Sequence, residues 1–249
     1  MKFQDIVAGL PETKLAYWEE PYKKEDKANL IRVIKEGGSY YLVLDSTIFH
    51  PKSGGQPSDT GILMGEGFTF YVKKCFKVDR HVVLWGKGQG EVKLGEVVQR
   101  IDWENRYLFM RRHAAAHLFD AALEKVRSEA CDPVDSWLGN DTYVGYRGKA
   151  PAQSELESII QFIRECIRKD LAVTSKIIDR NEVREKRSLW RSVLENLERI
   201  RIVQIDDFNP VPCGGTHVEK LGELGEIVIK EVKQEEGTFR IYYDVSIQS

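Results

Sequence analysis

The sequence predicts an α+β protein in which an N-terminal, β-rich, barrel-like subdomain (residues 1–102) precedes an α+β domain (residues 103–249). Two observations lead to this class. Short apolar runs separated by glycine turns, with no helical period, fill residues 28–102. After Trp103 the composition changes to long stretches of helix formers that alternate with strand-like segments. A chain of 249 residues is long enough for both parts to bury a core.

Glycine pairs punctuate the N-terminal part. Gly37-Gly38 lies between two runs with strand character, which is a hairpin signal, and the arrangement repeats around residues 65–67. The runs "DRHVVLWG" and "GEVVQRIDW" add two further short strands. These patterns favour a small antiparallel barrel or sandwich.

The second part begins with "WENRYLFMRRHAAAHLFDAALEKVRSEA", a predicted helix without glycine or proline. Ser154 and Glu157 form a capping-box pattern at the start of the next helix. A polar segment at 181–200 is a third predicted helix. The remaining predicted strands are 141–148, 172–179, 201–208, 225–232 and 238–245.

Composition excludes several classes of protein. The formal net charge is −2, from 37 basic and 39 acidic residues, so any contact with nucleic acid must be a local patch. No apolar run reaches transmembrane length, and the first residues lack the apolar core of a signal peptide. The four cysteines show no scaffold pattern, which favours reduced thiols. We therefore expect a cytoplasmic protein without a membrane partner.

Two spaced pairs of residues predict a metal site. His113 and His117 in "HAAAH" stand four positions apart and share one face of the predicted helix. Cys213 and His217 in "PCGGTHV" have the same spacing, with two glycines that permit a tight turn. Three imidazoles and one thiolate suit a tetrahedral Zn²⁺ better than magnesium or calcium. The fold must bring the two pairs together.

Four ligands are typical of a structural zinc ion, whereas a catalytic ion keeps a position open for water. Two interpretations stay open: one ligand is loose and a water is activated, or the ion orients the substrate through its amino group. No general base is evident, so the catalytic residue stays unknown. The other histidines, His50 and His81, are expected at the surface or in the core. Cys75 and Cys166 are expected to be core residues.

"HAAAH" and "CGGTHV" resemble the editing domain of alanyl-tRNA synthetases and the related freestanding AlaX editing proteins, in their medium-sized class. "DSTIFHPKSGGQPSDTG" at 45–61 is similar to the family's glycine-rich motif, and "DSWLG" and "FRIYY" have counterparts in it. The sequence departs from the family pattern in three places. His50 stands where tyrosine is usual, Ala114 to Ala116 carry no hydroxyl, and a glutamine is replaced near Pro133.

The resemblance implies a zinc-dependent hydrolase that removes serine or glycine from mischarged tRNA(Ala). The chain carries no synthetase core, so no use of ATP is expected. The resemblance also implies that Gly54, Gly55 and Gln56 face the editing site or the tRNA acceptor end. Since the alanines of "HAAAH" offer no hydroxyl, Ser136 and Thr142 are the candidates that read the serine side chain.

Basic residues in "MRR" (110–112) and "RNEVREKRSLWRSV" (180–193) are candidates for phosphate contacts, or else form solvated helix faces. Two other functions stay open for the chain. One is a zinc-stabilised tRNA-binding module without hydrolysis, and the other is a threonine-type editing domain. In either case we expect residues 1–102 to position tRNA and residues 103–249 to hold the metal.

Overall fold

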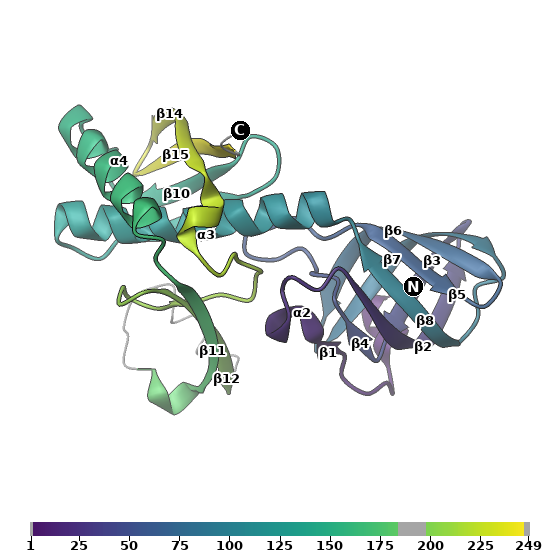
Figure 1. Ribbon diagram of the computed structural model, residues 1–249. Coiled ribbons are helices and arrows are strands. Elements are labelled where there is room, and N and C mark those ends of the chain that lie inside the picture. The colour runs from purple at the N-terminus through teal and green to yellow at the C-terminus, as the bar shows by residue number, and fades with distance from the viewer. Residues whose placement is uncertain (1, 184–197, 247–249) are drawn as a thin grey trace. The chain divides into compact units, whose positions relative to one another are not determined.

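The computed structural model describes residues 2–183 and 198–246, and it divides into two compact units (Figure 1). The first unit comprises Met1–Ser53 and Pro57–Tyr107, and the second comprises Gly54–Gln56 and Leu108–Ser249. The glycine-rich stretch at 54–56 therefore belongs to the second unit, although the first unit surrounds it in sequence. The predicted α+β class with an N-terminal barrel is confirmed.

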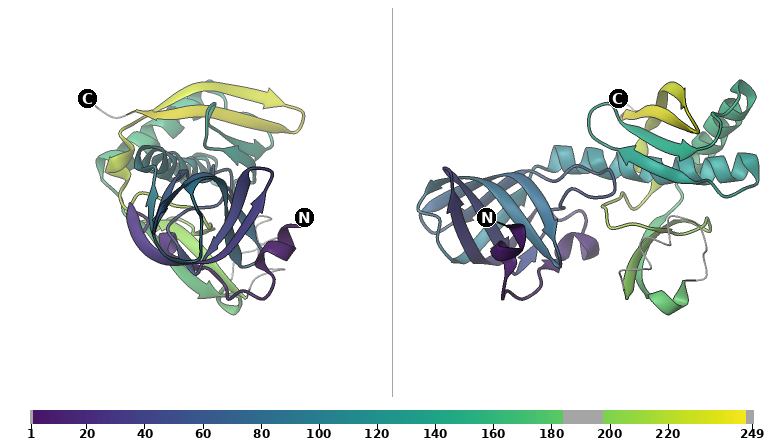
Figure 2. Two further views of the ribbon diagram at one scale, coloured as in Figure 1. Left: turned by 90° about the vertical axis from the view of Figure 1, so that its right-hand side faces the viewer. Right: turned by 180° about the vertical axis from the view of Figure 1, so that it is seen from behind.

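The first unit is a closed barrel of six antiparallel strands (Figure 2, left). In barrel order its strands are β2 (Glu25–Glu36), β3 (Ser39–Leu44), β7 (His81–Gly90), β6 (Phe68–Val78), β5 (Gly61–Gly65) and β8 (Gly95–Ile101). Four short elements accompany them, namely α1 (Phe3–Val7), β1 (Lys14–Leu15), α2 (Ala16–Glu19) and β4 (Ser46–Thr47). The predicted hairpin at Gly37-Gly38 joins β2 to β3, with φ angles of 55° and 79° that favour glycine.

A β-bulge keeps two lysines of β6 out of the barrel core. Phe68, Phe70 and Val72 alternate into the interior, and strict alternation would turn Lys74 inward next. The register shifts between Val72 and Lys74, so that Cys75 is buried in place of the lysine. The bulge thus spares the core an unpaired charge.

The described residues of the second unit form two sheets and two longer helices. One sheet has the strand order β14 (Glu226–Glu235), β15 (Thr238–Ser246), β10 (Tyr143–Arg147) and β9 (Pro133–Trp137). The other has the order β11 (Val173–Asp179), β12 (Arg199–Ile205) and β13 (Val211–Pro212). The helices are α3 (Trp103–Arg127) and α4 (Gln153–Arg168), and two short 3₁₀ segments are η1 (Arg180–Glu182) and η2 (Leu221–Leu224).

Helix α3 packs along the four-stranded sheet (Figure 1). The ring centroids of Phe119 and Tyr243 lie 4.9 Å apart, and the Tyr243 hydroxyl donates to the Arg112 carbonyl oxygen at 2.7 Å. Ala114 and Ala115 are fully buried and Ala116 is nearly so. These small side chains let neighbouring elements approach the helix closely between the two histidines.

The start of helix α4 differs from the sequence expectation. Helix α4 begins one residue before Ser154, and its capping contact is made by Glu155, whose carboxylate accepts the Ala152 N–H at 2.8 Å. This bond and Arg127 lower the pKa of Glu155. Most of the helix predicted at 181–200 falls outside the described residues. Among the residues that the structure describes, no helix is long and apolar enough to cross a membrane.

The arginines of "MRR" do not lie on a solvated face. Arg111 and Arg112 are only 3% and 8% exposed. The Arg111 guanidinium donates to the carbonyl oxygens of Glu223, Leu224 and Ser246. Arg112 donates to the carbonyl oxygens of Leu138 and Gly139 and pairs with Asp244. Both side chains hold loop carbonyl oxygens and the end of β15 in place, so the expected phosphate contact is wrong for this segment.

A buried ion pair ties the first turn of α3 to the barrel unit. Arg106 and Asp59 are 0% and 2% exposed. The Arg106 guanidinium donates to both carboxylate oxygens of Asp59, and also to the carbonyl oxygens of Ile48 and Pro21. Asp59 additionally accepts the His50 N–H at 2.6 Å. Every polar atom that this pair brings inside therefore has a partner.

We expect Asp59→Ala to lower the free energy of unfolding by about 3–5 kcal/mol, because it leaves the Arg106 charge buried without its partner. Urea denaturation measures the change. The matched control is Glu66→Ala, which breaks the exposed Lys93–Glu66 pair in the same unit and should leave the free energy of unfolding nearly unchanged. Equal changes in the free energy of unfolding for the two substitutions would contradict the larger contribution expected of the buried ion pair.

Candidate metal centre

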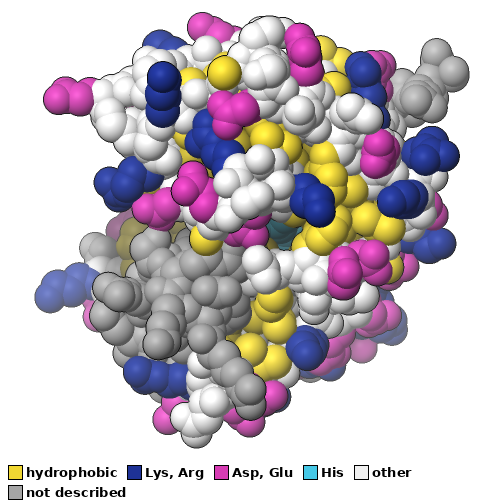
Figure 3. All heavy atoms as spheres, turned by 90° about the vertical axis from the view of Figure 1, so that its left-hand side faces the viewer, with side chains coloured by type: hydrophobic (Ala, Val, Ile, Leu, Met, Phe, Trp, Pro, Cys, Tyr) yellow, Lys and Arg dark blue, Asp and Glu magenta, His cyan; other side chains and the backbone are white. Residues whose placement is uncertain are grey.

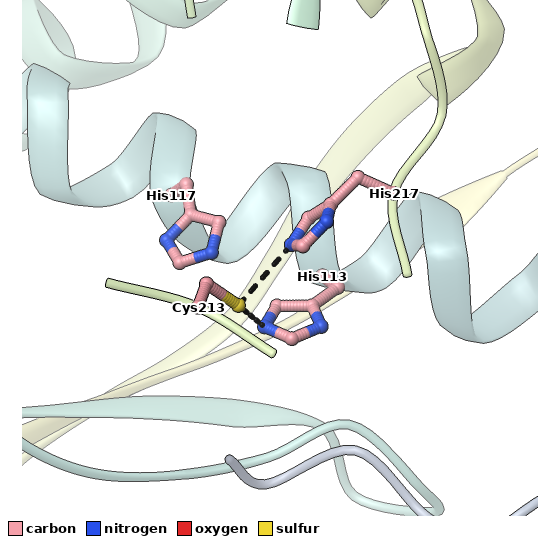
Figure 4. A group of neighbouring side chains, drawn as sticks. All are labelled: His113, His117, Cys213 and His217. Carbon is pink, nitrogen blue, oxygen red and sulfur yellow. Dashed lines mark hydrogen bonds between the residues drawn. The ribbon is translucent and has the colours of Figure 1, made fainter. Parts of the chain in front are cut away.

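The four predicted ligands converge. His113 and His117 project from one face of α3, while Cys213 and His217 come from the loop after β13 (Figure 4). One potential ligand atom from each residue lies within 4.8 Å of all the others. The spacing of "HAAAH" places the two imidazole centroids 5.0 Å apart on the helix, as the i, i+4 relation predicts.

The separations match the edges of a tetrahedral zinc site. Cys213 Sγ lies 3.3 Å from His113 Nε2 and 3.5 Å from His217 Nε2. Zinc bonds of about 2.0 Å to nitrogen and about 2.3 Å to sulfur give a nitrogen–sulfur edge of roughly 3.5 Å in a tetrahedron. His117 Nε2 is buried and has no hydrogen-bond partner. A buried nitrogen of this kind is what a metal ion satisfies, so the residues fit the ion.

Glycine is required in the ligand loop for steric reasons. A Cβ atom at Gly215 would lie 2.2 Å from His113 Cε1 and 2.8 Å from the side-chain oxygen of Gln56. Arg201, 7% exposed, donates to the carbonyl oxygens of Cys213 and Gly215, each at 2.9 Å. The second pair of ligands is therefore held by close packing on one side and by a buried guanidinium on the other.

A carboxylate stands behind His117. His117 Nδ1 lies 3.4 Å from an oxygen of Asp120, and the other oxygen of Asp120 accepts the Tyr146 hydroxyl at 2.7 Å. This arrangement leaves Nε2 of His117 to face the other ligands, as in the carboxylate–histidine–metal groupings of known sites. Asp120 was not among the residues predicted for the site, although its position three residues after His117 puts it near the same helix face.

The side chains of the cluster shift one another's protonation. Burial would raise the pKa of Cys213, but His113 and His217 bring it well below its usual value. Burial would lower the pKa of His117, but Asp120 and Cys213 raise it to about 10. Burial, with His113, lowers the pKa of His217 to about 3. Without a metal the cluster thus favours a thiolate beside an imidazolium, and an incoming ion has to displace that proton.

A small cavity of about 20 Å³ opens beside His117. Two carboxylates line it, Asp120 and Glu124, and the other lining residues are Ala121, Val203, Ile205, Phe208, Asn209 and Val211. In Figure 3, histidine surface is visible in a depression bordered by hydrophobic side chains. The cavity beside His117 has room for a group about the size of a water molecule.

The structure brings the glycine-rich stretch to the centre but not every expected residue. Gln56 is fully buried and contacts His113. The Gly55 carbonyl oxygen accepts a hydrogen bond from the Leu138 N–H. The Gly54 carbonyl oxygen accepts one from the Ser136 hydroxyl at 3.4 Å. The Thr142 hydroxyl is buried and donates to the residue 139 carbonyl oxygen at 2.6 Å. Neither Ser136 nor Thr142 lines the small cavity.

The remaining histidines and cysteines lie apart from the cluster. His50 is fully buried in the first unit, where its Nε2 lies 3.2 Å from the Ser53 hydroxyl, and His81 is 9% exposed. Cys75 and Cys166 are buried core residues, as expected. Cys131 belongs to no metal-ligating group among the described residues.

Family models match at both ends of the chain. The model for "tRNA synthetases class II (A)" matches residues 12–105. The model for the "Threonyl and Alanyl tRNA synthetase second additional domain" matches residues 200–242, which include two of the four ligands, Cys213 and His217.

Individual relatives cover nearly the whole chain. The alanine–tRNA ligase of Pyrococcus abyssi is 32% identical over 246 residues, covering 96% of this chain and 26% of the ligase. The corresponding ligase of Sulfurisphaera tokodaii is 31% identical over 251 residues, which is 96% of this chain and 27% of the ligase. The alanyl-tRNA editing protein AlaX-L of Pyrococcus horikoshii is 33% identical over 235 residues, 91% of this chain and 56% of AlaX-L.

The chain thus spans about a quarter of the length of these ligases and about half the length of AlaX-L. The motifs, the barrel, the convergent ligand set and the matches agree with one another. This chain is a relative of the alanine–tRNA ligases and of the alanyl-tRNA editing protein AlaX-L, and it resembles them along nearly its whole length.

Proposed function

We propose that this chain edits tRNA(Ala) by hydrolysing the ester bond to a wrongly attached serine or glycine, with Zn²⁺ held by His113, His117, Cys213 and His217. The observation that carries the proposal is the convergence of these four side chains in a chain that is 33% identical to AlaX-L. An editing site separate from the aminoacylation site is needed, because an apolar pocket that binds alanine rejects an amino acid with an added hydroxyl by only about a hundredfold.

The chemistry of the ligand set supports zinc. Thiolate and imidazole ligands suit Zn²⁺, and hard cations such as Mg²⁺ prefer oxygen. When bound, the ion would supply Lewis-acid polarisation of a substrate group or a fixed point that orients the substrate's amino group. The chain's own residues hold the imidazoles in place, and the carboxylates of Asp120 and Glu124 offer acceptors beside the cavity for a small polar or cationic group.

The protein purified without added zinc should contain one Zn²⁺ per chain, measured by elemental analysis. Cys213→Ala or His113→Ala should abolish stoichiometric zinc and lower the stability of the second unit, because the free energy of metal binding is also folding free energy. His81→Ala is the control, since His81 lies outside the ligand group and should keep the metal. A metal-free preparation with full deacylase activity would refute the metal role.

The small cavity supports a small amino-acid side chain as the part of the substrate that is recognised. Its volume of about 20 Å³ has room for a group about the size of a hydroxyl, and its lining mixes carboxylates with apolar residues. A serine hydroxyl that enters this cavity can donate to a carboxylate oxygen of its lining, whereas the methyl group of alanine cannot. The barrel unit would then serve to position the tRNA.

A tRNA-binding module without activity is the second candidate, because four protein ligands are typical of a closed structural zinc site. A threonine-type editing domain is the third, because the matching model at residues 200–242 covers both threonyl and alanyl tRNA synthetases. Deacylation assays with mischarged tRNA(Ala) and tRNA(Thr) separate the three. Activity only on tRNA(Thr) would exclude the alanine-type function, and binding without ester loss would exclude the enzyme.

The protein should deacylate Ser-tRNA(Ala) and spare Ala-tRNA(Ala), by about 10⁴-fold if the site is built on a hydrogen bond to the serine hydroxyl. Time courses of ester loss at equal enzyme concentration measure the ratio. Ser136→Ala and Thr142→Val test the two candidate readers of that hydroxyl, with zinc content measured in parallel. Equal rates on both charged tRNAs would mean that the protein does not select serine.

A further inference from the structure

Gln56 is buried, although it follows two glycines in a loop, where exposed residues are usual. Its side chain is 0% exposed. The preceding glycines have φ angles of 53° and 77°, and a Cβ atom at Gly55 would lie 2.3 Å from the Ser136 hydroxyl oxygen. The Gly55 carbonyl oxygen also accepts the Leu138 N–H at 3.0 Å. The loop is thus fixed by close packing, and it delivers one amide side chain into the interior.

The hydrogen bonds of Gln56 define its orientation. One side-chain atom lies 3.1 Å from the Thr216 backbone N–H and 2.8 Å from His113 Nδ1. A backbone N–H can only donate, so that atom is the amide oxygen Oε1. The amide nitrogen then donates to the Thr216 hydroxyl at 2.9 Å. Both lone pairs of Oε1 and one of the two N–H groups are used inside the protein.

This orientation fixes the tautomer of His113. Because Oε1 can only accept, His113 Nδ1 must carry the hydrogen. The hydrogen-free nitrogen of the neutral ring is then Nε2, and it points toward Cys213 Sγ at 3.3 Å. Gln56 therefore serves His113 as Asp120 serves His117, except that Gln56 adds no charge. Its second bond, to Thr216, connects the helix ligand to the loop between Cys213 and His217.

We propose that Gln56 is a positioning residue of the metal centre, which holds His113 in its ligating tautomer and joins the helix ligands to the loop ligands. This inference rests on the proposed metal site. It gives the amide of Gln56 a role in metal retention that is separate from any contact with the substrate.

Gln56→Leu removes both acceptor contacts at nearly constant volume, and we expect it to weaken zinc binding by about 10- to 100-fold, the usual effect of losing an outer partner of a ligand. Gln56→Glu keeps acceptor oxygens for His113 and Thr216 and should stay within a few-fold of the unaltered protein. Thr216→Val removes only the hydroxyl that receives the amide N–H, and its loss of zinc affinity should be smaller than that of Gln56→Leu.

The chain offers a matched control in Gln99. This glutamine is also 0% exposed, and its oxygen accepts the Thr47 hydroxyl and the Ile48 N–H, while its nitrogen donates to the Ser46 carbonyl oxygen. Gln99→Leu removes the same kind of buried amide from the barrel unit. It should lower stability without changing zinc affinity, which separates positioning of the ligands from a general packing effect.

The test uses the full chain, with zinc affinity measured by competition with a chromophoric chelator and ligand geometry by the visible spectrum of the Co²⁺ form. The inference predicts an altered Co²⁺ spectrum and weakened zinc binding for Gln56→Leu, and neither for Gln99→Leu. Unchanged zinc affinity in Gln56→Leu would overturn it. If Gln56→Leu does not fold, unchanged zinc affinity in Thr216→Val would overturn it instead.

These results are distinguishable from failure of the proposed function. A protein that binds zinc through Gln56 as described, yet leaves Ser-tRNA(Ala) intact, refutes the editing function and keeps the positioning role. A protein that deacylates Ser-tRNA(Ala) and binds zinc equally well with leucine at position 56 refutes only the positioning role. An unaltered protein that binds no zinc refutes both.

Discussion

Four ligand atoms that converge on one point impose the central constraint on the second unit. Three imidazoles and a thiol within 4.8 Å of one another leave His117 Nε2 without a partner. Such an arrangement is costly unless an ion binds there. The surroundings hold it together all the same: alanines between the helix ligands, a glycine against the His113 ring, and Arg201 on the carbonyls of the ligand loop.

The charges around the centre suit a divalent cation. Cys213 supplies one negative charge as a thiolate, and Asp120 supplies another behind His117. Together they would neutralise a Zn²⁺ ion in this partly enclosed position, where an excess charge of either sign is unfavourable.

The sequence could predict the features that depend on local periodicity. The i, i+4 spacing of the histidines, the glycine pair between Cys213 and His217, and the barrel hairpins all follow from geometry within a few residues. The contacts of Gln56 could not be predicted in this way, because they join positions 160 residues apart through the tertiary fold. The burial of Arg111 and Arg112 was missed for the same reason, since their acceptors are backbone carbonyls that carry no sequence signature.

The capping contact at the start of α4 also differs from the one that the sequence predicts. The pattern in the sequence is the pair Ser154 and Glu157, but the contact that forms joins the Glu155 carboxylate to the Ala152 N–H. Boundaries of helices are set by single hydrogen bonds, and several residues in a polar stretch can supply them.

Four buried arginines, Arg106, Arg111, Arg112 and Arg201, share one use: each donates to backbone carbonyl oxygens inside the molecule. Their guanidinium groups are committed to folding and cannot release counterions from a polyanion. The number of basic residues in the composition is therefore larger than the number of cationic side chains that can contact tRNA phosphates. For a chain of formal charge −2, binding of tRNA would then depend less on ionic strength than a count of basic residues suggests.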